Sequence, residues 1–319
     1  MKHYNDILQK PFKDAGFTVI YQPSCLLNPY DGNKWPIQYP EVNWTDNTVV
    51  IMHCQDFVNV RDNVCCELLD IESYFGERAN QVVVVVWNLN IPYTGPLNVI
   101  YFPTHSYEIL TELNRRKQEW LSEFDCIKTT NWQCLNGQVK PHRVNVVNYL
   151  RSRTDGILSL KNQIPLTNAE YDRVYNWNNI LNWFELLPVY TKCKVNIVTE
   201  TEYAYEFSII TEKTLMAFLA LQVPIIIGYK HVINECESLG FDMFRDIVET
   251  DYDTYNDQDR WEQALVLNKD IIEGKFNYNA LQERLIRNRE YALTVWPELV
   301  VEWFNSNAQD ILENLRQSS

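Results

Sequence analysis

Glycine is scarce in this sequence, with 9 among 319 residues, and basic residues are outnumbered by acidic ones, 28 to 42. No internal repeat or low-complexity tract is present, and the formal net charge is −14. Proteins that bind nucleic acid along its backbone usually carry a basic face, because phosphate contacts supply most of their affinity. The charge argues against an extended nucleic-acid-binding surface, but it does not exclude a local basic groove that acts on a base.

The eight cysteines do not show the spacings of metal-binding or redox motifs. No Cys-x-x-Cys pair occurs, and the adjacent Cys65 and Cys66 match no ligand pattern, so we expect reduced thiols. The N-terminal residues contain no apolar segment typical of a signal peptide, and no apolar run is long enough to span a bilayer. These absences predict a cytoplasmic protein with no membrane span.

The sequence has the apolar content of a globular protein, with 46% hydrophobic and 22% charged residues. Its length suits two domains or one large α/β unit. The 10 Trp, 19 Tyr and 13 Phe residues would suit a protein that stacks sugars or bases, although aromatic rings also fill ordinary cores. Length and composition therefore indicate the size and class of the fold, and only the motifs can indicate the function.

Continuous apolar runs alternate with helical patterns along the chain. Such runs are typical of strands in parallel sheets, which are buried on both faces. We predict strands at residues 17–22, 48–56, 81–87, 98–102, 126–131, 133–137, 156–160, 194–200 and 224–228. We predict one or two helices over residues 62–80, and single helices over residues 106–124, 141–150, 211–221, 232–244, 257–275, 278–295 and 297–315.

This alternation predicts two facing Rossmann-like domains. Residues 1–125 would form the N-terminal domain, and residues 126–296 the C-terminal one. The last helix, in residues 297–319, would pack back on the N-terminal domain. Functional groups in parallel sheets lie just beyond the carboxyl ends of the strands. Polar residues at such positions in the N-terminal half are His53, Asp56, Asn88, Asn90 and His105.

The segment from residue 207 to residue 228 contains the clearest candidate site. Thr211 is a good N-cap, and Glu212 and Lys213 follow in the first helical turn. Backbone N–H groups, a hydroxyl and an ammonium meet there at the positive end of a helix dipole, which suits a phosphate. The alternative is a capped surface helix with a solvated Glu–Lys pair.

A second cation has an unusual helical position. Pro141 begins the predicted helix, and Arg143 therefore lies in its first turn. A cation at that position gains nothing from the helix dipole, so its placement indicates contact with an anion.

The candidate segment also resembles a known family. Ile209-Ile-Thr211-Glu212-Lys213, a helix and Val223-Pro-Ile-Ile-Ile-Gly228 are similar to the Tyr-Val-Thr-Glu-Lys and Val-Pro-Val-x-x-Gly motifs of the α1,3-fucosyltransferases. Those glycosyltransferases have two facing Rossmann-like domains, the GT-B fold. The resemblance covers roughly residues 48–228, and the Thr-Glu-Lys motif is its most specific part.

Shorter motifs match in the same order. His53-Cys-Gln-Asp56 after a strand resembles the family's His-His-Arg-Asp/Glu, and Trp87-Asn-Leu-Asn90-Ile-Pro resembles Met-Asn-Phe-Glu-Ser-Pro. Leu135-Asn136 followed by Arg143 resembles a Ser-Asn segment with a donor-binding arginine. Val198-Thr-Glu200 resembles a Phe-Glu-Asn segment. The segment over residues 239–244 also resembles glycosyltransferase-like proteins of bacteriophages.

The resemblance implies a nucleoside-diphosphate sugar as the donor substrate. Arg143 and Lys213 would neutralise the diphosphate, and Glu212 would accept hydrogen bonds from the ribose hydroxyls. Glu200 would hold the sugar or the ribose. The remaining residues of the implied donor set are Asn136, Ser208 and Thr211. No Asp-x-Asp sequence follows a predicted strand end, so we expect no metal and no further cofactor.

The acceptor, a carbohydrate or another molecule with a hydroxyl group, would bind the N-terminal half. Asn90 occupies the position of the family's catalytic glutamate, and an amide cannot take a proton at neutral pH. Asp56 is the first alternative base and His53 the second, although Asp56 could instead cap the following turn. Ile209 replaces a donor-binding tyrosine, so we do not carry fucose over as the transferred sugar.

Three alternatives to this function stay open. The chain could glycosylate a nucleic-acid base, as some phage enzymes do, although its charge disfavours this. It could be a degenerate nucleotide-sugar-binding protein without catalysis, an interpretation that Asn90 favours. It could also be an α/β protein with no role in sugar chemistry.

Overall fold

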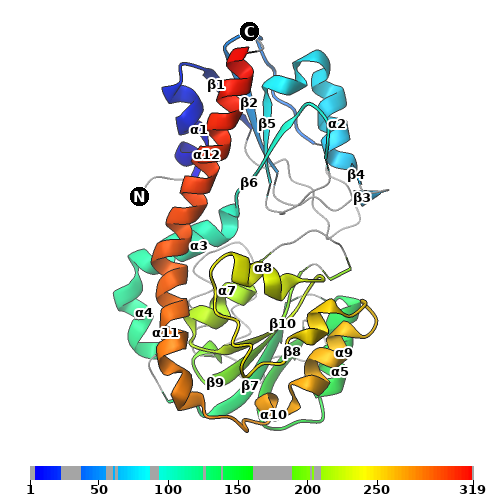
Figure 1. Ribbon diagram of the computed structural model, residues 1–319, viewed down its shortest axis with the longest axis vertical. Helices are drawn as coiled ribbons and strands as arrows, with labels where there is room; N and C mark the ends of the chain where they lie inside the picture. The colour runs from blue at the N-terminus through cyan, green and yellow to red at the C-terminus, as the bar shows by residue number, and fades with distance from the viewer. Residues whose placement is uncertain are drawn as a thin grey trace. The chain divides into compact units, whose positions relative to one another are not determined.

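The computed structural model shows an α/β protein with two four-stranded parallel sheets (Figure 1). Its internal contacts divide the chain into two compact units, Met1–Glu108 with Glu298–Ser319 and Ile109–Pro297. We refer to these as unit 1 and unit 2. The structure describes residues 4–22, 37–54, 60–61, 64–86, 93–124, 127–137, 139–160, 189–201, 203–204 and 210–317. Three predicted site residues, Asp56, Asn90 and Ser208, lie outside the described residues.

The sheet of unit 1 has the strand order β1-β2-β5-β6, and each neighbouring pair is parallel. All four strands were predicted from their apolar runs. Their bounds are Thr18–Gln22 (β1), Thr48–Cys54 (β2), Val82–Val86 (β5) and Asn98–Tyr101 (β6). The sequence did not predict a small antiparallel pair, Val60–Arg61 (β3) with Val64–Cys65 (β4). The helices are Tyr4–Asp14 (α1), Cys66–Phe75 (α2), Gly76–Gln81 (η1), and Trp296–Gln317 (α12), of which residues 298–317 belong to this unit.

Side chains of β2 alternate between two packed faces. Val50 and Met52 belong to a core cluster with Leu68 and Ile71 of α2. His53 lies on the opposite face, where its ring is 5.4 Å from that of Tyr4 in α1. Unit 1 therefore has helices on both faces of its sheet, as buried parallel strands require.

Helix α12 completes the core of unit 1 with aromatic contacts. Trp303 packs edge-on against Tyr101, and Phe304 packs edge-on against Phe102. Phe304 has no solvent exposure. The C-terminal helix is thus part of the same core as the N-terminal sheet.

The sheet of unit 2 has the order β10-β9-β7-β8 and is also parallel throughout. Its strands are Thr130–Asn136 (β7), Gly156–Leu160 (β8), Cys193–Thr199 (β9) and Val223–Ile227 (β10). The main helices around it are Lys117–Phe124 (α4), Pro141–Leu150 (α5), Glu212–Leu219 (α7), Val232–Ser238 (α8), Arg260–Leu267 (α9), Lys269–Ile272 (α10) and Gln282–Glu290 (α11). The remaining described elements are helix α3 (Thr104–Arg115), two short 3₁₀-helices, η2 (Asp251–Thr254) and η3 (Tyr278–Leu281), and a π-helical segment, η4 (Tyr291–Val295).

The strand order of unit 2 reverses beside β7. From β7 the chain passes through α5 to β8 on one side, whereas β9 lies on the other side of β7 and continues through α7 to β10. Parallel crossovers are right-handed, so two connections that leave in opposite directions place their helices on opposite faces. Figure 1 shows this arrangement, with α5 and α9 on one face and α7 and α11 on the other.

Several local predictions were wrong; the helix predicted over residues 232–244, for example, ends at Ser238. The structure has one strand, β7 (Thr130–Asn136), where two were predicted at residues 126–131 and 133–137, since Trp132 is fully buried and continues the pairing with both neighbours. Gly156 permits this pairing, because a Cβ atom there would lie 2.0 Å from the Trp132 ring. The expected helix over residues 106–124 is interrupted at Arg116. There the Trp120 indole donates to the Leu113 carbonyl, which a continuous helix would bond to the N–H of residue 117.

Within the described part of the chain, no helix has both the length and the apolar character that crossing a membrane requires.

Candidate functional site

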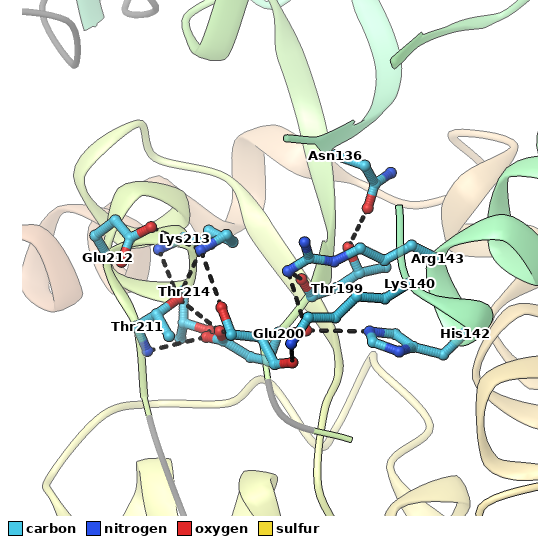
Figure 2. A network of polar contacts seen from close by, with 11 residues as sticks. Asn136, Lys140, His142, Arg143, Thr199, Glu200, Thr211, Glu212, Lys213 and Thr214 are labelled. Atoms are coloured by element: carbon cyan, nitrogen blue, oxygen red, sulfur yellow. Dashed lines mark hydrogen bonds and ion pairs between the residues drawn. The ribbon is translucent and has the colours of Figure 1, made fainter. Parts of the chain in front are cut away.

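The candidate site lies at the carboxyl edge of the unit 2 sheet, where the strand order reverses. Strand β7 ends at Asn136 and strand β9 at Thr199, and these neighbours lead toward helices on opposite faces. In open α/β sheets, this reversal opens a crevice in which ligands bind. The residues drawn in Figure 2 come from the two strand ends and from the N-termini of α5 and α7.

Asn136 joins the ends of three strands. Its side-chain amide donates to the Ser159 carbonyl of β8 at 3.2 Å, and its oxygen accepts a hydrogen bond from the Thr199 hydroxyl of β9. Asn136 is 1% exposed. The Asn136 side chain, which was predicted to bind the donor, therefore makes hydrogen bonds within the protein. These bonds hold the carboxyl ends of β8 and β9 next to that of β7.

Glu200 is the centre of the network and has no solvent exposure. Its Oε1 accepts hydrogen bonds from the Thr211 backbone N–H at 3.1 Å and from the Thr214 hydroxyl at 2.6 Å. Its Oε2 accepts from the Thr211 hydroxyl at 2.5 Å and from the Thr201 N–H at 3.3 Å. The carboxylate thus ties the end of β9 to the beginning of α7, and Figure 2 shows it between the two helix N-termini.

The backbone carbonyl of Glu200 contacts side chains of α5. The His142 ring is 3.1 Å from the Glu200 carbonyl oxygen, and Arg143 Nη2 donates to the carbonyl oxygens of Thr199 and Glu200 at 3.1 and 3.2 Å. Arg143 is 1% exposed. A buried guanidinium bonded to two strand-end carbonyls stabilises this edge of the sheet, so replacing Arg143 should reduce the stability of the fold.

His142 is held neutral by its surroundings. Burial, together with the positive charges of Arg143, Lys140 and Arg260, lowers its pKa to about 3. Its ring also stacks on Tyr203 with a centroid distance of 4.6 Å, and Tyr203 in turn lies under the Arg260 guanidinium. Three cations therefore lie close enough to His142 to oppose its protonation.

Lys140 and Lys213 are less deeply buried than Arg143 and Glu200. The Lys213 ammonium is 2.6 Å from Glu212 Oε1 and 3.5 Å from the Thr201 hydroxyl. Lys140, the residue before α5, donates to the Thr201 carbonyl at 2.6 Å. The prediction that Thr211 caps α7 is confirmed, because its hydroxyl accepts from the Lys213 N–H at 3.3 Å.

The structure thus brings six of the predicted donor-site residues into one network: Asn136, Arg143, Glu200, Thr211, Glu212 and Lys213. Sequence reasoning missed Lys140, His142, Thr199 and Thr214. Lys140 and His142 could have been found, since both lie within three residues of Arg143 at a helix N-terminus. Thr214 carries no such signal, because only the folded chain places its hydroxyl at Glu200.

In unit 1, His53 is fully buried at the end of β2. Its Nε2 lies 2.8 Å from the Thr104 hydroxyl and its Nδ1 lies 3.3 Å from the Tyr21 hydroxyl. Burial lowers its pKa to about 4, so the ring is neutral at physiological pH. The two other candidate catalytic residues, Asp56 and Asn90, lie outside the described residues, as does Ser208 of the donor set.

Among the described residues, no group of three or more His, Cys, Asp or Glu side chains is placed to hold a metal ion. The six cysteines in this part of the chain are free thiols, and burial raises the pKa of Cys134 and Cys193 to about 12.

Comparisons with protein-family models, with curated proteins and with solved structures gave no significant match.

Proposed function

We propose that the chain is a glycosyltransferase that moves a sugar from a nucleoside-diphosphate sugar to an acceptor hydroxyl, with inversion and without a metal ion. In this proposal the two units adopt the facing arrangement of the GT-B fold. The donor binds the carboxyl edge of the unit 2 sheet, and the acceptor binds unit 1 beside residues 53–56 and 90.

One observation carries the proposal. The Thr-Glu-Lys motif and the arginine helix, which are 68 residues apart when counted from Arg143 to Thr211, begin on either side of the reversal in strand order. Two helix N-termini and their cations thus converge on the end of β9 (Figure 2). Helix dipoles and backbone N–H groups favour anions at such positions.

The chemistry that this edge can supply is stabilisation of a departing diphosphate. Breaking the bond between sugar and phosphate leaves negative charge on the phosphate oxygens, and fixed positive charges lower the energy of that state. Lys213 lies in the first turn of α7. In this proposal its neighbour Glu212 accepts hydrogen bonds from the ribose hydroxyls. Glycosylation of a nucleic-acid base has less support, since the net charge of −14 opposes binding to a polyanion.

Slow hydrolysis of the donor in the absence of acceptor tests the proposal. The protein is incubated with a panel of nucleotide sugars, and the released nucleoside diphosphate is measured with and without excess EDTA. We expect hydrolysis of at least one donor, which EDTA leaves intact. The Lys213→Met variant should hydrolyse that donor more slowly, whereas Lys269→Ala, which removes a lysine from the exposed surface of α10, should not change the rate.

The other outcomes each have a meaning. Binding of a nucleotide sugar without hydrolysis would indicate the degenerate binding protein. Neither binding nor hydrolysis across the panel would reject a role in sugar transfer. Loss of hydrolysis with EDTA and its recovery with Mn²⁺ would reject the metal-free mechanism.

A further inference from the structure

A buried carboxylate, Asp253, holds the loop that follows β10 in unit 2. Asp253 is 3% exposed and belongs to η2. Its Oδ2 accepts a hydrogen bond from the Ile233 N–H in the first turn of α8 at 2.9 Å, and its backbone carbonyl accepts one from the His231 N–H at 3.2 Å. The loop over residues 228–231 is therefore tied to a turn that comes after α8 in the chain.

The backbone of this loop has an unfavourable conformation at His231, the N-cap of α8. Its φ is 73°, in the left-handed region that favours glycine. The capping hydrogen bond of α8 comes from Asp253 rather than from the N-cap side chain. Strained backbone persists only where the surrounding contacts enforce it. The loop should therefore relax when its contact with Asp253 weakens.

The second carboxylate oxygen of Asp253, Oδ1, is buried and has no hydrogen-bond partner among the described residues. Arg260 and Arg245 are close enough to interact with the charge of Asp253, yet both guanidinium groups bond elsewhere. Their acceptors are Tyr203, Gly228, Tyr255 and Asp257 for Arg260, and Asn234, Glu237 and Thr250 for Arg245. An ionised carboxylate whose buried oxygen lacks a donor is unfavourable, whereas a proton on Oδ1 removes the charge.

Titratable and charged groups face Asp253 from the elements packed around it. They are His231 in the loop, Cys236 in α8, Tyr252 in η2, Arg260 in α9 and Arg245 between α8 and η2. Burial has the largest effect on Asp253 and raises its pKa to about 6, although the nearby N–H groups of α8 and the positive charges of His231 and Arg260 oppose that rise. Burial also raises the pKa of Cys236 and of Tyr252, so both stay neutral.

We propose that Asp253 is a proton-controlled latch: protonated Asp253 keeps η2 packed on the loop over residues 228–231, and release of the proton to water lets that contact open. An exposed aspartate ionises near pH ~3.9 and buried Asp253 at about pH 6, so the opened loop binds fewer protons than the closed one across this range. The proton-dependent part of the contact is fully present below pH ~3.9 and is lost as the pH rises through about 6. The loop lies beside the candidate site, since a Cβ atom on Gly228 would lie 3.2 Å from Glu200 Cβ. The latch itself does not depend on the proposed function.

Amide hydrogen exchange of the full chain, measured by NMR from pH 5 to pH 7.5, tests the latch. Each rate is divided by the intrinsic exchange rate at the same pH, so that the quotient reports opening of the structure. We expect the protection of the Ile233 and His231 amides to fall about tenfold between pH 5 and pH 7, the ratio that pKa values of ~3.9 and about 6 give. The Val195 amide in β9 should show no such fall, because the low pKa of buried His142 makes unit 2 more stable as the pH rises toward 6.5.

Three variants assign the effect to one group. Asp253→Asn cannot release a proton, so the protection of its Ile233 amide should lose the pH dependence. Asp251→Asn changes an exposed carboxyl of the same turn and should retain it. His231→Asn should retain it as well, since asparagine tolerates a positive φ.

Two results would overturn the latch. The first is protection of Ile233 that stays constant or rises with pH in the unmodified protein, a measurement that does not depend on the folding of any variant. The second is a tenfold fall that persists in Asp253→Asn, because another group would then control the opening.

Discussion

The hydroxyl of Thr211 donates a 2.5 Å hydrogen bond to Oε2 of Glu200, a carboxylate with no solvent exposure. Thr211 is the N-cap of α7, and Glu200 follows β9 directly. This contact joins the two segments that the sequence singled out separately. It also gives Glu200 an internal role, in which the side chain positions the Thr-Glu-Lys segment.

The first prediction follows from this contact. In Glu200→Gln one acceptor oxygen becomes an amide donor that faces Thr211 or Thr214, so at least one buried hydrogen bond is lost. The free energy of unfolding should fall by about 1–3 kcal/mol, measured by urea denaturation. The matched variant Glu262→Gln changes an exposed residue of α9 and should have almost no effect. Equal stability of both variants would show that the Glu200 network contributes little.

The second prediction separates the two cations of the family motif. Lys213→Met should weaken binding of a nucleoside diphosphate by roughly 1.5–3 kcal/mol. It should lower the melting temperature less than Arg143→Met does, because the Lys213 side chain is 17% exposed and Arg143 is 1% exposed. Arg143→Met should reduce both affinity and melting temperature, since it removes bonds to two buried carbonyls. Calorimetry and thermal unfolding on the same preparations measure the two quantities. A stable Arg143 variant with intact affinity would remove Arg143 from the site.

The third prediction concerns acid stability. An unfolded histidine ionises near pH 6.5, whereas burial lowers the pKa of folded His53 to about 4 and that of His142 to about 3. Between pH 6.5 and about 4 the unfolded chain therefore binds more protons than the native one. The free energy of unfolding should fall as the pH drops through this window, by at most about 1.4 kcal/mol per pH unit for each histidine.

A comparison of variants isolates the histidine contribution. His53→Gln should have a shallower pH dependence than the unmodified protein when urea denaturation is repeated from pH 7 to pH 4. Asp253 acts in the opposite direction, because burial raises its pKa to about 6 and its folded form gains a proton first. Asp253→Asn should therefore steepen the loss of stability below pH 6. An unchanged slope in His53→Gln would mean that its charge state does not control acid unfolding.

The fourth prediction concerns the base that accepts the proton of the acceptor hydroxyl. If Asp56 is this base, Asp56→Asn should cut turnover by about 10²–10⁴-fold and leave donor affinity and melting temperature unchanged. If Asp56 instead caps a turn, the same substitution should lower stability and spare turnover. His53 has no solvent exposure, so His53→Gln should affect stability first. Normal turnover in both variants would require a base from elsewhere or a different mechanism.

The sequence by itself determined the parallel sheets and the beginning of α7. Runs such as Val82–Val86 lack polar alternation, and that pattern suits a strand buried on both faces, so the strand positions followed directly. Thr211 was identifiable as an N-cap because a side-chain oxygen there satisfies a free N–H group of the first turn. These are local properties, and local chemistry specifies them.

The tertiary structure alone decided what each site residue touches. Sequence spacing could not show that Glu200 and Arg143 are buried in the protein, because burial depends on strands and helices that are distant in the chain. The meeting of Lys140 and Lys213 at Thr201 required the strand order β10-β9-β7-β8, which places two helix N-termini beside one strand end. Strand order is a property of long-range packing. It brought motifs that are separate in the sequence to one edge of the sheet.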